Sequence, residues 1–138
     1  MEVLEKIPTL KVGLILLAVY GFAWISLEGD PRWSSIMALI TLLVGAGYLA
    51  KKLVRGRTIN GIGWMVLLAS CGLVIGLLFG PFTLFYMALK TGLHGHWAEF
   101  TRAEMLWFID GILLWVVSGL LAGAVLGFLT TAFKQGAN

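Results

Sequence analysis

Residues 72–80 read GLVIGLLFG and residues 119–127 read GLLAGAVLG, so each stretch repeats a glycine at every fourth position. Four-residue spacing places the glycines on one face of an α-helix, where they let two backbones approach closely within a membrane. The pattern predicts two transmembrane helices that pack on each other as an antiparallel pair. Self-association into a ring or channel, or close approach to a flat lipid or pigment, is the alternative use of these faces. The six glycines are Gly72, Gly76, Gly80, Gly119, Gly123 and Gly127.

The composition around these stretches is that of a membrane protein. Hydrophobic residues make up 59% of the 138 residues and charged residues only 12%, about half of the charged share of a soluble domain. About 20 apolar residues cross the hydrocarbon core as a helix. The sequence predicts one all-α integral membrane domain over residues 1–138, with four transmembrane helices at about 11–27, 34–50, 62–89 and 105–133. Little chain is left for a separate soluble catalytic domain.

The positions of the basic residues predict the orientation. Most Lys and Arg residues lie at the two termini and in the loop between the second and third spans, and short basic loops stay in the cytoplasm. Both termini are therefore expected in the cytoplasm. The loop run Lys51, Lys52, Arg55 and Arg57 could also bind anionic lipid head groups, or could serve topology alone. The net charge of +3 is spread among helix ends, so the expected partners are lipids and other membrane proteins, not nucleic acid.

The third and fourth predicted helices are longer than a membrane is thick. Each measures roughly 42 Å, against a hydrocarbon core of about 30 Å, so they are expected to form a long helical hairpin that extends on the outer side. Its loop is expected at Lys90 to Phe100, and Thr101 with Glu104 forms a capping-box pattern after it. Pro81 is expected to kink the third helix. Residues 82–89 are apolar on every face, so loops or another protein should cover them.

The expected hairpin loop holds the residues with the most chemical potential. His94 and His96 could ligate a transition metal through neutral imidazole, with Glu99 and Asp110 as further ligands, or could hold a haem or chlorin from one side. Ordinary polar residues of the membrane interface are the alternative. Asp110 is expected near the outer boundary of its span, either in a polar contact at the helix end or in binding or proton transfer. No cofactor is required by the sequence.

The stretch from residue 87 to residue 101 reads MALKTGLHGHWAEFT. It resembles a Lys-x-Gly-Leu-His-x-His-Gly-Pro-Glu-Phe loop of small bacterial membrane proteins that have four spans and no known activity. Trp97 and Ala98 stand here in place of the Gly-Pro pair. The resemblance implies a four-span protein of the bacterial cytoplasmic membrane.

Three hypotheses for the function follow. The leading one is a non-catalytic accessory subunit of a larger membrane complex, with energy-converting complexes of electron transfer or photosynthesis as examples. The second is a metal- or cofactor-binding protein that uses the histidine loop. The third is a homo-oligomeric small channel or transporter built on the glycine faces. No enzymatic motif is present, so enzyme activity is not expected.

Overall fold

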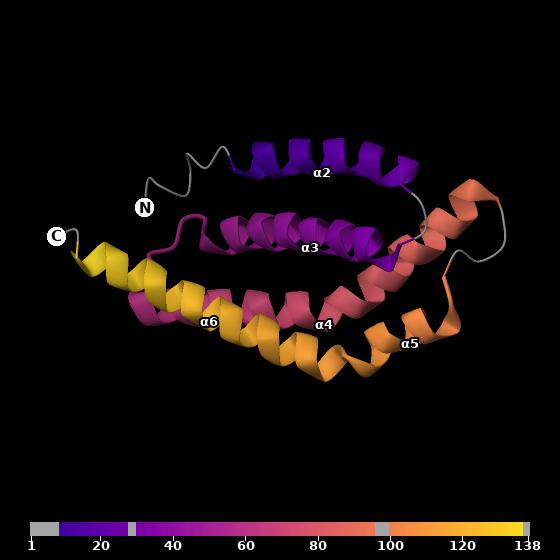
Figure 1. Cartoon of the computed structure of the whole chain (residues 1–138). Coiled ribbons are helices and arrows are strands. Elements are labelled where there is room, and N and C mark those ends of the chain that lie inside the picture. Colours follow the sequence, from indigo (N-terminus) through magenta and orange to yellow (C-terminus); the bar gives the residue numbers. More distant parts are fainter. Residues whose placement is uncertain (1–8, 28–29, 96–99, 137–138) are drawn as a thin grey trace.

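The computed structural model describes residues 9–27, 30–95 and 100–136, and in these residues the regular elements are helices. They are α2 (Thr9–Ser26), α3 (Pro31–Val54), α4 (Gly61–His94), α5 (Arg102–Asp110) and α6 (Ile112–Gly136) (Figure 1). Three helices are long and apolar enough to cross a membrane: Pro31–Val54, Gly61–His94 and Ile112–Phe133. A shorter apolar helix, Leu10–Ser26, precedes them. The prediction of an all-helical chain with membrane-spanning character is confirmed at this level.

The helices lie side by side in the order α2, α3, α4 and α6 (Figure 1). We call the end of the molecule where α3 ends and α4 begins the basic end, and the end with the C-terminus of α4 and all of α5 the hairpin end. Large apolar side chains face outward on these helices, for example Phe22 at 79% exposure and Leu113 at 75%. Surfaces that are apolar all round suit contact with lipid.

The contact between α4 and α6 runs along five of the six glycines. A Cβ atom added to Gly72 would overlap the backbone oxygen of Gly119, and one added to Gly119 would overlap that of Gly72. Near the basic end, a Cβ on Gly127 would lie 2.7 Å from the Cα of Met65. Residue numbers rise along one helix as they fall along the other, so the pair is antiparallel. Gly76 and Gly123 would likewise meet backbone atoms across this contact, whereas a Cβ on Gly80 would meet the backbone oxygen of Phe108 in α5.

Helix α4 is longer than predicted. It continues to His94 instead of ending at Leu89, and the connection begins only at Gly95, whose φ of 65° is the left-handed conformation that ends a helix. The expected loop start at Lys90 was therefore wrong. Pro81 lies inside α4, where it removes one backbone hydrogen bond, and α4 bends along its length in Figure 1.

The predicted continuous helix over residues 105–133 was wrong, because α5 and α6 meet at Gly111. The ψ angle of Gly111 is −1°, far from the helical value of about −42°. A Cβ atom at this position would lie 2.6 Å from Nε1 of Trp115, so the indole occupies the space that a side chain would need. At the start of α5, the capping box of Thr101 and Glu104 is confirmed.

The apolar segment of residues 82–89 is covered on one face by the chain itself. Thr83 and Met87 are buried, and Met87 packs with Phe100 and Phe108 at the hairpin end. The other face carries an exposed apolar stripe, which consists of Phe85 (58% exposed), Leu89 (40%) and Leu93 (58%). The chain itself thus covers part of the surface of this segment.

Candidate functional site

The predicted histidine site is only partly within the described residues. His94 ends α4, is partly buried, and its Nδ1 lies 3.0 Å from the carbonyl oxygen of Lys90. His96 and Glu99 lie outside the described residues. This part of the prediction therefore stays a prediction.

Asp110 lies at the end of α5 that is remote from the hairpin connection. Its side chain is exposed, and the length of α5 separates it from Arg102 by about 12 Å along the helix axis. Within residues 9–27, 30–95 and 100–136, no group of three or more His, Cys, Asp or Glu side chains could hold a metal ion.

Lys90 is the buried charged residue that the sequence analysis had placed in a loop. It is only 1% exposed, and its Nζ donates a hydrogen bond to the carbonyl oxygen of Leu27, at the end of α2. The same ammonium lies 5.7 Å from the centroid of the Trp24 ring, within the range of a cation–π contact. A helix C-terminus favours a nearby positive charge. Lys90 therefore ties α4 to the end of α2.

Further polar contacts join α2, α3 and α4 beside Lys90. Nε1 of Trp24 donates to Oγ of Ser34 at 3.4 Å, and Oγ1 of Thr41 lies 2.8 Å from the hydroxyl oxygen of Tyr86. The rings of Trp24 and Tyr86 meet edge to face at 5.5 Å. We call these five residues, Lys90 included, the clasp cluster. Two hydrogen bonds join residues within the cluster, and a third joins Lys90 to Leu27, which fits a role in holding α2 in place.

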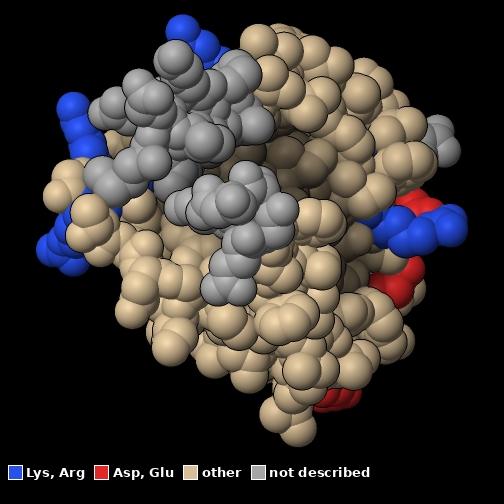
Figure 2. Space-filling view, turned by 90° about the vertical axis from the view of Figure 1, so that its left-hand side faces the viewer, with Lys and Arg blue, Asp and Glu red and all other residues tan. Residues whose placement is uncertain are grey.

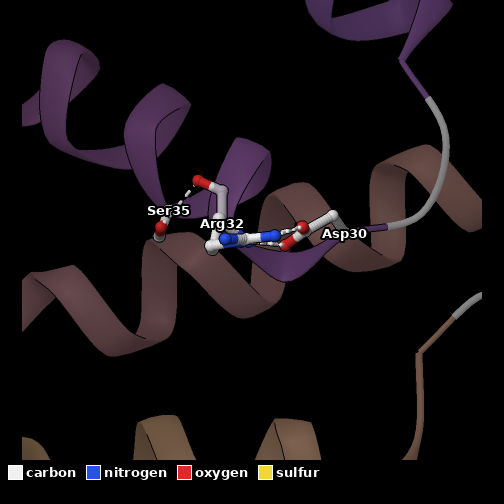
Figure 3. Close-up of polar contacts among 3 residues, drawn as sticks. All are labelled: Asp30, Arg32 and Ser35. Carbon is white, nitrogen blue, oxygen red and sulfur yellow. Dashed lines mark hydrogen bonds and ion pairs between the residues drawn. The ribbon is translucent and has the colours of Figure 1, made fainter.

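The first turn of α3 is fixed by a compact ion pair (Figure 3). Asp30 caps the helix by accepting a hydrogen bond from the backbone N–H of Arg32 at 2.8 Å, and Nε of Arg32 lies 2.8 Å from Oδ2 of the same carboxylate. These hydrogen bonds, the side-chain one first, lower the pKa of Asp30 below its ordinary value. Oγ of Ser35 donates to the carbonyl oxygen of Arg32 at 2.8 Å. The guanidinium side chain remains 85% exposed.

A cavity of about 440 Å³ opens next to this ion pair, between the start of α3, the middle of α4, α5 and the start of α6. Its volume lies in the range typical of small-molecule sites, about 300 to 1,000 Å³. Four aromatic and two charged residues are among those that line it: Phe79, Trp107, Phe108, Trp115, Arg32 and Glu104.

The aromatic wall of this cavity is ordered by ring contacts around Trp115. Its ring lies edge to face with Phe79 at 5.0 Å and with Trp107 at 5.3 Å. Nε1 of Trp115 is buried, and it has no hydrogen-bond partner within the part of the chain that the structure describes. A buried donor left without an acceptor costs about 1 to 3 kcal/mol. The buried nitrogen lies against Gly111, where an added Cβ atom would be only 2.6 Å away.

The basic run of residues 51–57 lies at the opposite end of the molecule. Lys51 and Lys52 are in the last turn of α3, where positive charge is favourable, and Arg55 and Arg57 are exposed beyond it. Lys and Arg side chains stand at the margin of the face seen in Figure 2. This position is compatible with both predicted uses, topology and contact with anionic lipid head groups.

Neither the cavity nor the clasp cluster was predicted from the sequence. The aromatic residues of the cavity are spread over three helices, and their spacing carries no periodic signal. One signal was available, because the dipeptide of Asp110 and Gly111 is a common turn signal and marks the break that shapes the cavity. Comparisons with models of protein families, with curated proteins and with solved structures find no match to this chain.

Proposed function

We propose that this chain is a non-catalytic accessory subunit of a larger membrane protein assembly, and that it crosses the membrane four times. Helix α2 is the fourth span in this proposal, because its 18 residues measure about 27 Å, close to the hydrocarbon thickness of about 30 Å. It is apolar and lies along α3 (Figure 1). The clasp cluster supports this placement by holding the end of α2 against α4.

The proposed orientation places the basic end in the cytoplasm. The start of α2, the end of α3 and the end of α6 lie at this same end of the molecule (Figure 1), as an even number of spans requires. The basic residues here lie in the last turn of α3, as Lys51 and Lys52 do, or follow the end of this span, as Arg55 and Arg57 do. A short basic loop of this kind is retained in the cytoplasm.

The exposed apolar stripe of α4 is the observation that carries the subunit proposal. The 34 residues of α4 measure about 51 Å, more than the hydrocarbon core of about 30 Å, so part of this helix extends beyond the core. Lys90 bonds the carbonyl oxygen of Leu27 at the end of α2, which puts the boundary near Lys90. The stripe crosses this boundary, with Phe85 (58% exposed) and Leu89 (40%) inside it and Leu93 (58%) beyond it. Exposed apolar patches outside the bilayer mark protein interaction surfaces. Another membrane protein that extends to the same height would cover this stripe.

Site-specific photocrosslinking in the native membrane tests the subunit role. A photoreactive amino acid at Leu89 should give one protein adduct of defined mass, and the same protein should co-purify with the chain in mild detergent. A matched probe at Leu121, which is 60% exposed on α6, should give mainly lipid adducts. The Leu89→Glu variant should lose the co-purifying protein. If the probe at Leu89 yields only lipid adducts, as at Leu121, the subunit role is wrong.

Cysteine labelling in intact cells tests the orientation separately. In a Cys71→Ala background, Arg57→Cys and Arg102→Cys place single thiols at opposite ends of the molecule, both at exposed positions. A membrane-impermeant maleimide should label residue 102 in intact cells and residue 57 only after permeabilisation. The reverse pattern would contradict the proposed topology, and labelling of both in intact cells would contradict the number of spans between them.

A further inference from the structure

The basic end carries positive charge that the described part of the chain does not balance. Its exposed or half-exposed basic residues are Lys11, Lys51, Lys52, Arg55 and Arg57. Within the described residues, the acidic side chains lie instead at the hairpin end, at Asp30, Glu104 and Asp110. None of the five basic side chains forms an ion pair with a described residue. Figure 2 looks at the basic end and shows Lys and Arg side chains gathered along its left and upper margin, whereas the acidic ones lie on the right.

The end of α3 folds the basic run of residues 51–57 into a compact group. The backbone N–H of Arg55 donates to the carbonyl oxygen of Lys51 at 3.1 Å, and that of Arg57 donates to the carbonyl oxygen of Val54 at 3.0 Å. Gly56 lies between the two arginines with a φ of 76°, the left-handed conformation that turns a chain at a helix end. Four residues along a helix axis measure about 6 Å, so like charges lie close together here. An anion bound among them relieves their mutual repulsion.

The basic run also lies at the depth of lipid head groups. Arg32 and Lys51 lie near the two ends of the candidate span Pro31–Val54, and the helix rises about 28 Å from the one to the other. Because this rise matches the hydrocarbon core of about 30 Å, a membrane centred on α3 has these two residues at its boundaries. Tyr48, which is 54% exposed, is an aromatic residue of the kind that this interface favours. The phosphate groups of phospholipids lie just outside the same boundary.

We propose that the basic run at the end of α3 binds the phosphate head group of an anionic phospholipid. The guanidinium groups of Arg55 and Arg57 suit a phosphate, because a planar guanidinium donates two hydrogen bonds to it at once. Lys51 and Lys52 add positive charge, which favours an anionic lipid over a zwitterionic one whose own ammonium group balances its phosphate. This inference rests on α3 as a membrane span, and it needs neither the subunit role nor the proposed orientation.

Native mass spectrometry of the full chain tests the proposal. The chain is released from nanodiscs that contain equal amounts of phosphatidylglycerol and phosphatidylcholine, and the lipids that stay bound are identified by mass. Each basic residue at the membrane surface favours the anionic lipid about 5-fold, so we expect phosphatidylglycerol adducts to exceed phosphatidylcholine adducts by about 10-fold or more. Equal retention of the two lipids, as expected if the basic run serves topology alone or binds an acidic protein, would overturn the proposal. Added glycerol phosphate should not change the preference, and its loss would overturn the proposal in favour of a site for free phosphate.

Matched variants assign the binding to the basic run. The double variant Arg55→Gln, Arg57→Gln should show a preference at least about 5-fold lower than that of the parent chain. Arg32→Gln is the control, because this arginine is equally exposed to solvent at the hairpin end but is balanced by Asp30, and it should keep the parental preference. A preference in the double variant equal to that of Arg32→Gln would refute the site. Lys51→Gln, Lys52→Gln decides the question by the same comparison if the arginine variant does not fold. Both leaflets of a nanodisc have the same composition, so a changed topology does not affect the result.

Discussion

The substitution Gly72→Ala tests the closest contact of the fold, the approach of α4 to α6. The added Cβ would lie 2.9 Å from the carbonyl carbon of Gly119 and 3.2 Å from the Cα of Gly123, and closer still to the oxygen of Gly119. All three atoms belong to the backbone of α6, which cannot rotate out of the way as a side chain can. The two helices must therefore move apart by about 1 Å to restore van der Waals distances.

The magnitude follows from two opposing terms. Overpacking of a tight contact costs about 1 to 3 kcal/mol, and the upper half of that range applies because the obstacle is backbone. Replacing a helical glycine by alanine returns up to about 1 kcal/mol through helix propensity. We expect a net loss of about 2 kcal/mol in the free energy of unfolding. Separation of the helices also weakens van der Waals contact along the rest of the pair, which drives association in lipid.

The assay is unfolding in mixed micelles titrated with SDS, followed by circular dichroism. Gly45→Ala is the matched control, since Gly45 lies within α3 and a Cβ there would meet nothing within 4 Å. This control should be unchanged or more stable by up to about 1 kcal/mol. The two variants should therefore differ by about 2 to 3 kcal/mol. Equal stability of Gly72→Ala and Gly45→Ala would refute the close approach of α4 and α6.

Three further perturbations address other parts of the structure. Lys90→Met removes the donor to the carbonyl oxygen of Leu27 and should lower the local stability at the end of α2 by about 1 to 3 kcal/mol. This loss is measured as faster hydrogen exchange at the end of α2. Lys52→Met, at the exposed basic end, should leave that exchange unchanged. Thr101→Ala removes the cap of α5 and should cost about 1 kcal/mol, and a thermal unfolding midpoint equal to that of the parent chain would contradict it. The pKa of Asp30 is lowered in the fold. Its contribution to stability is therefore complete above the ordinary carboxyl pKa and is lost as the pH falls through the lowered value. An acid titration of stability in which Asp30→Ala shows the same pH dependence as the parent chain would contradict this.

The sequence correctly predicted helices, but two of their boundaries were wrong. These are the end of α4, which lies at His94, and the break between α5 and α6 at Gly111. Gly111 ends α5 with a ψ angle of −1°. The Trp115 indole occupies the space that a side chain there would need, and the positions of the two residues in the sequence do not show that contact. His94 remains helical because Gly95 is the residue that adopts the left-handed conformation, and this conformation ends α4. Lys90 looked like a loop residue because a lysine after an apolar run is usually solvated.

Of the candidate sites, one was predicted from the sequence and another was found only in the structure. The histidine loop was visible as a motif, and metal binding there stays a prediction because His96 and Glu99 lie outside the described residues. The channel hypothesis also stays a prediction. The cavity was invisible in the sequence, since Phe79 and Trp115 come together only through the antiparallel packing of α4 and α6.

The sequence by itself determined that the chain is helical, that its helices are apolar enough for a membrane, and where close helix packing is possible. Those properties depend on composition and on the four-residue spacing of glycines such as Gly72 and Gly76, which are local features. Only the packing of the helices shows which backbone atoms the glycines meet, that Lys90 bonds the end of α2, and that aromatic rings from three helices line one open cavity. These outcomes depend on the relative depth and rotation of the helices, which no single segment encodes.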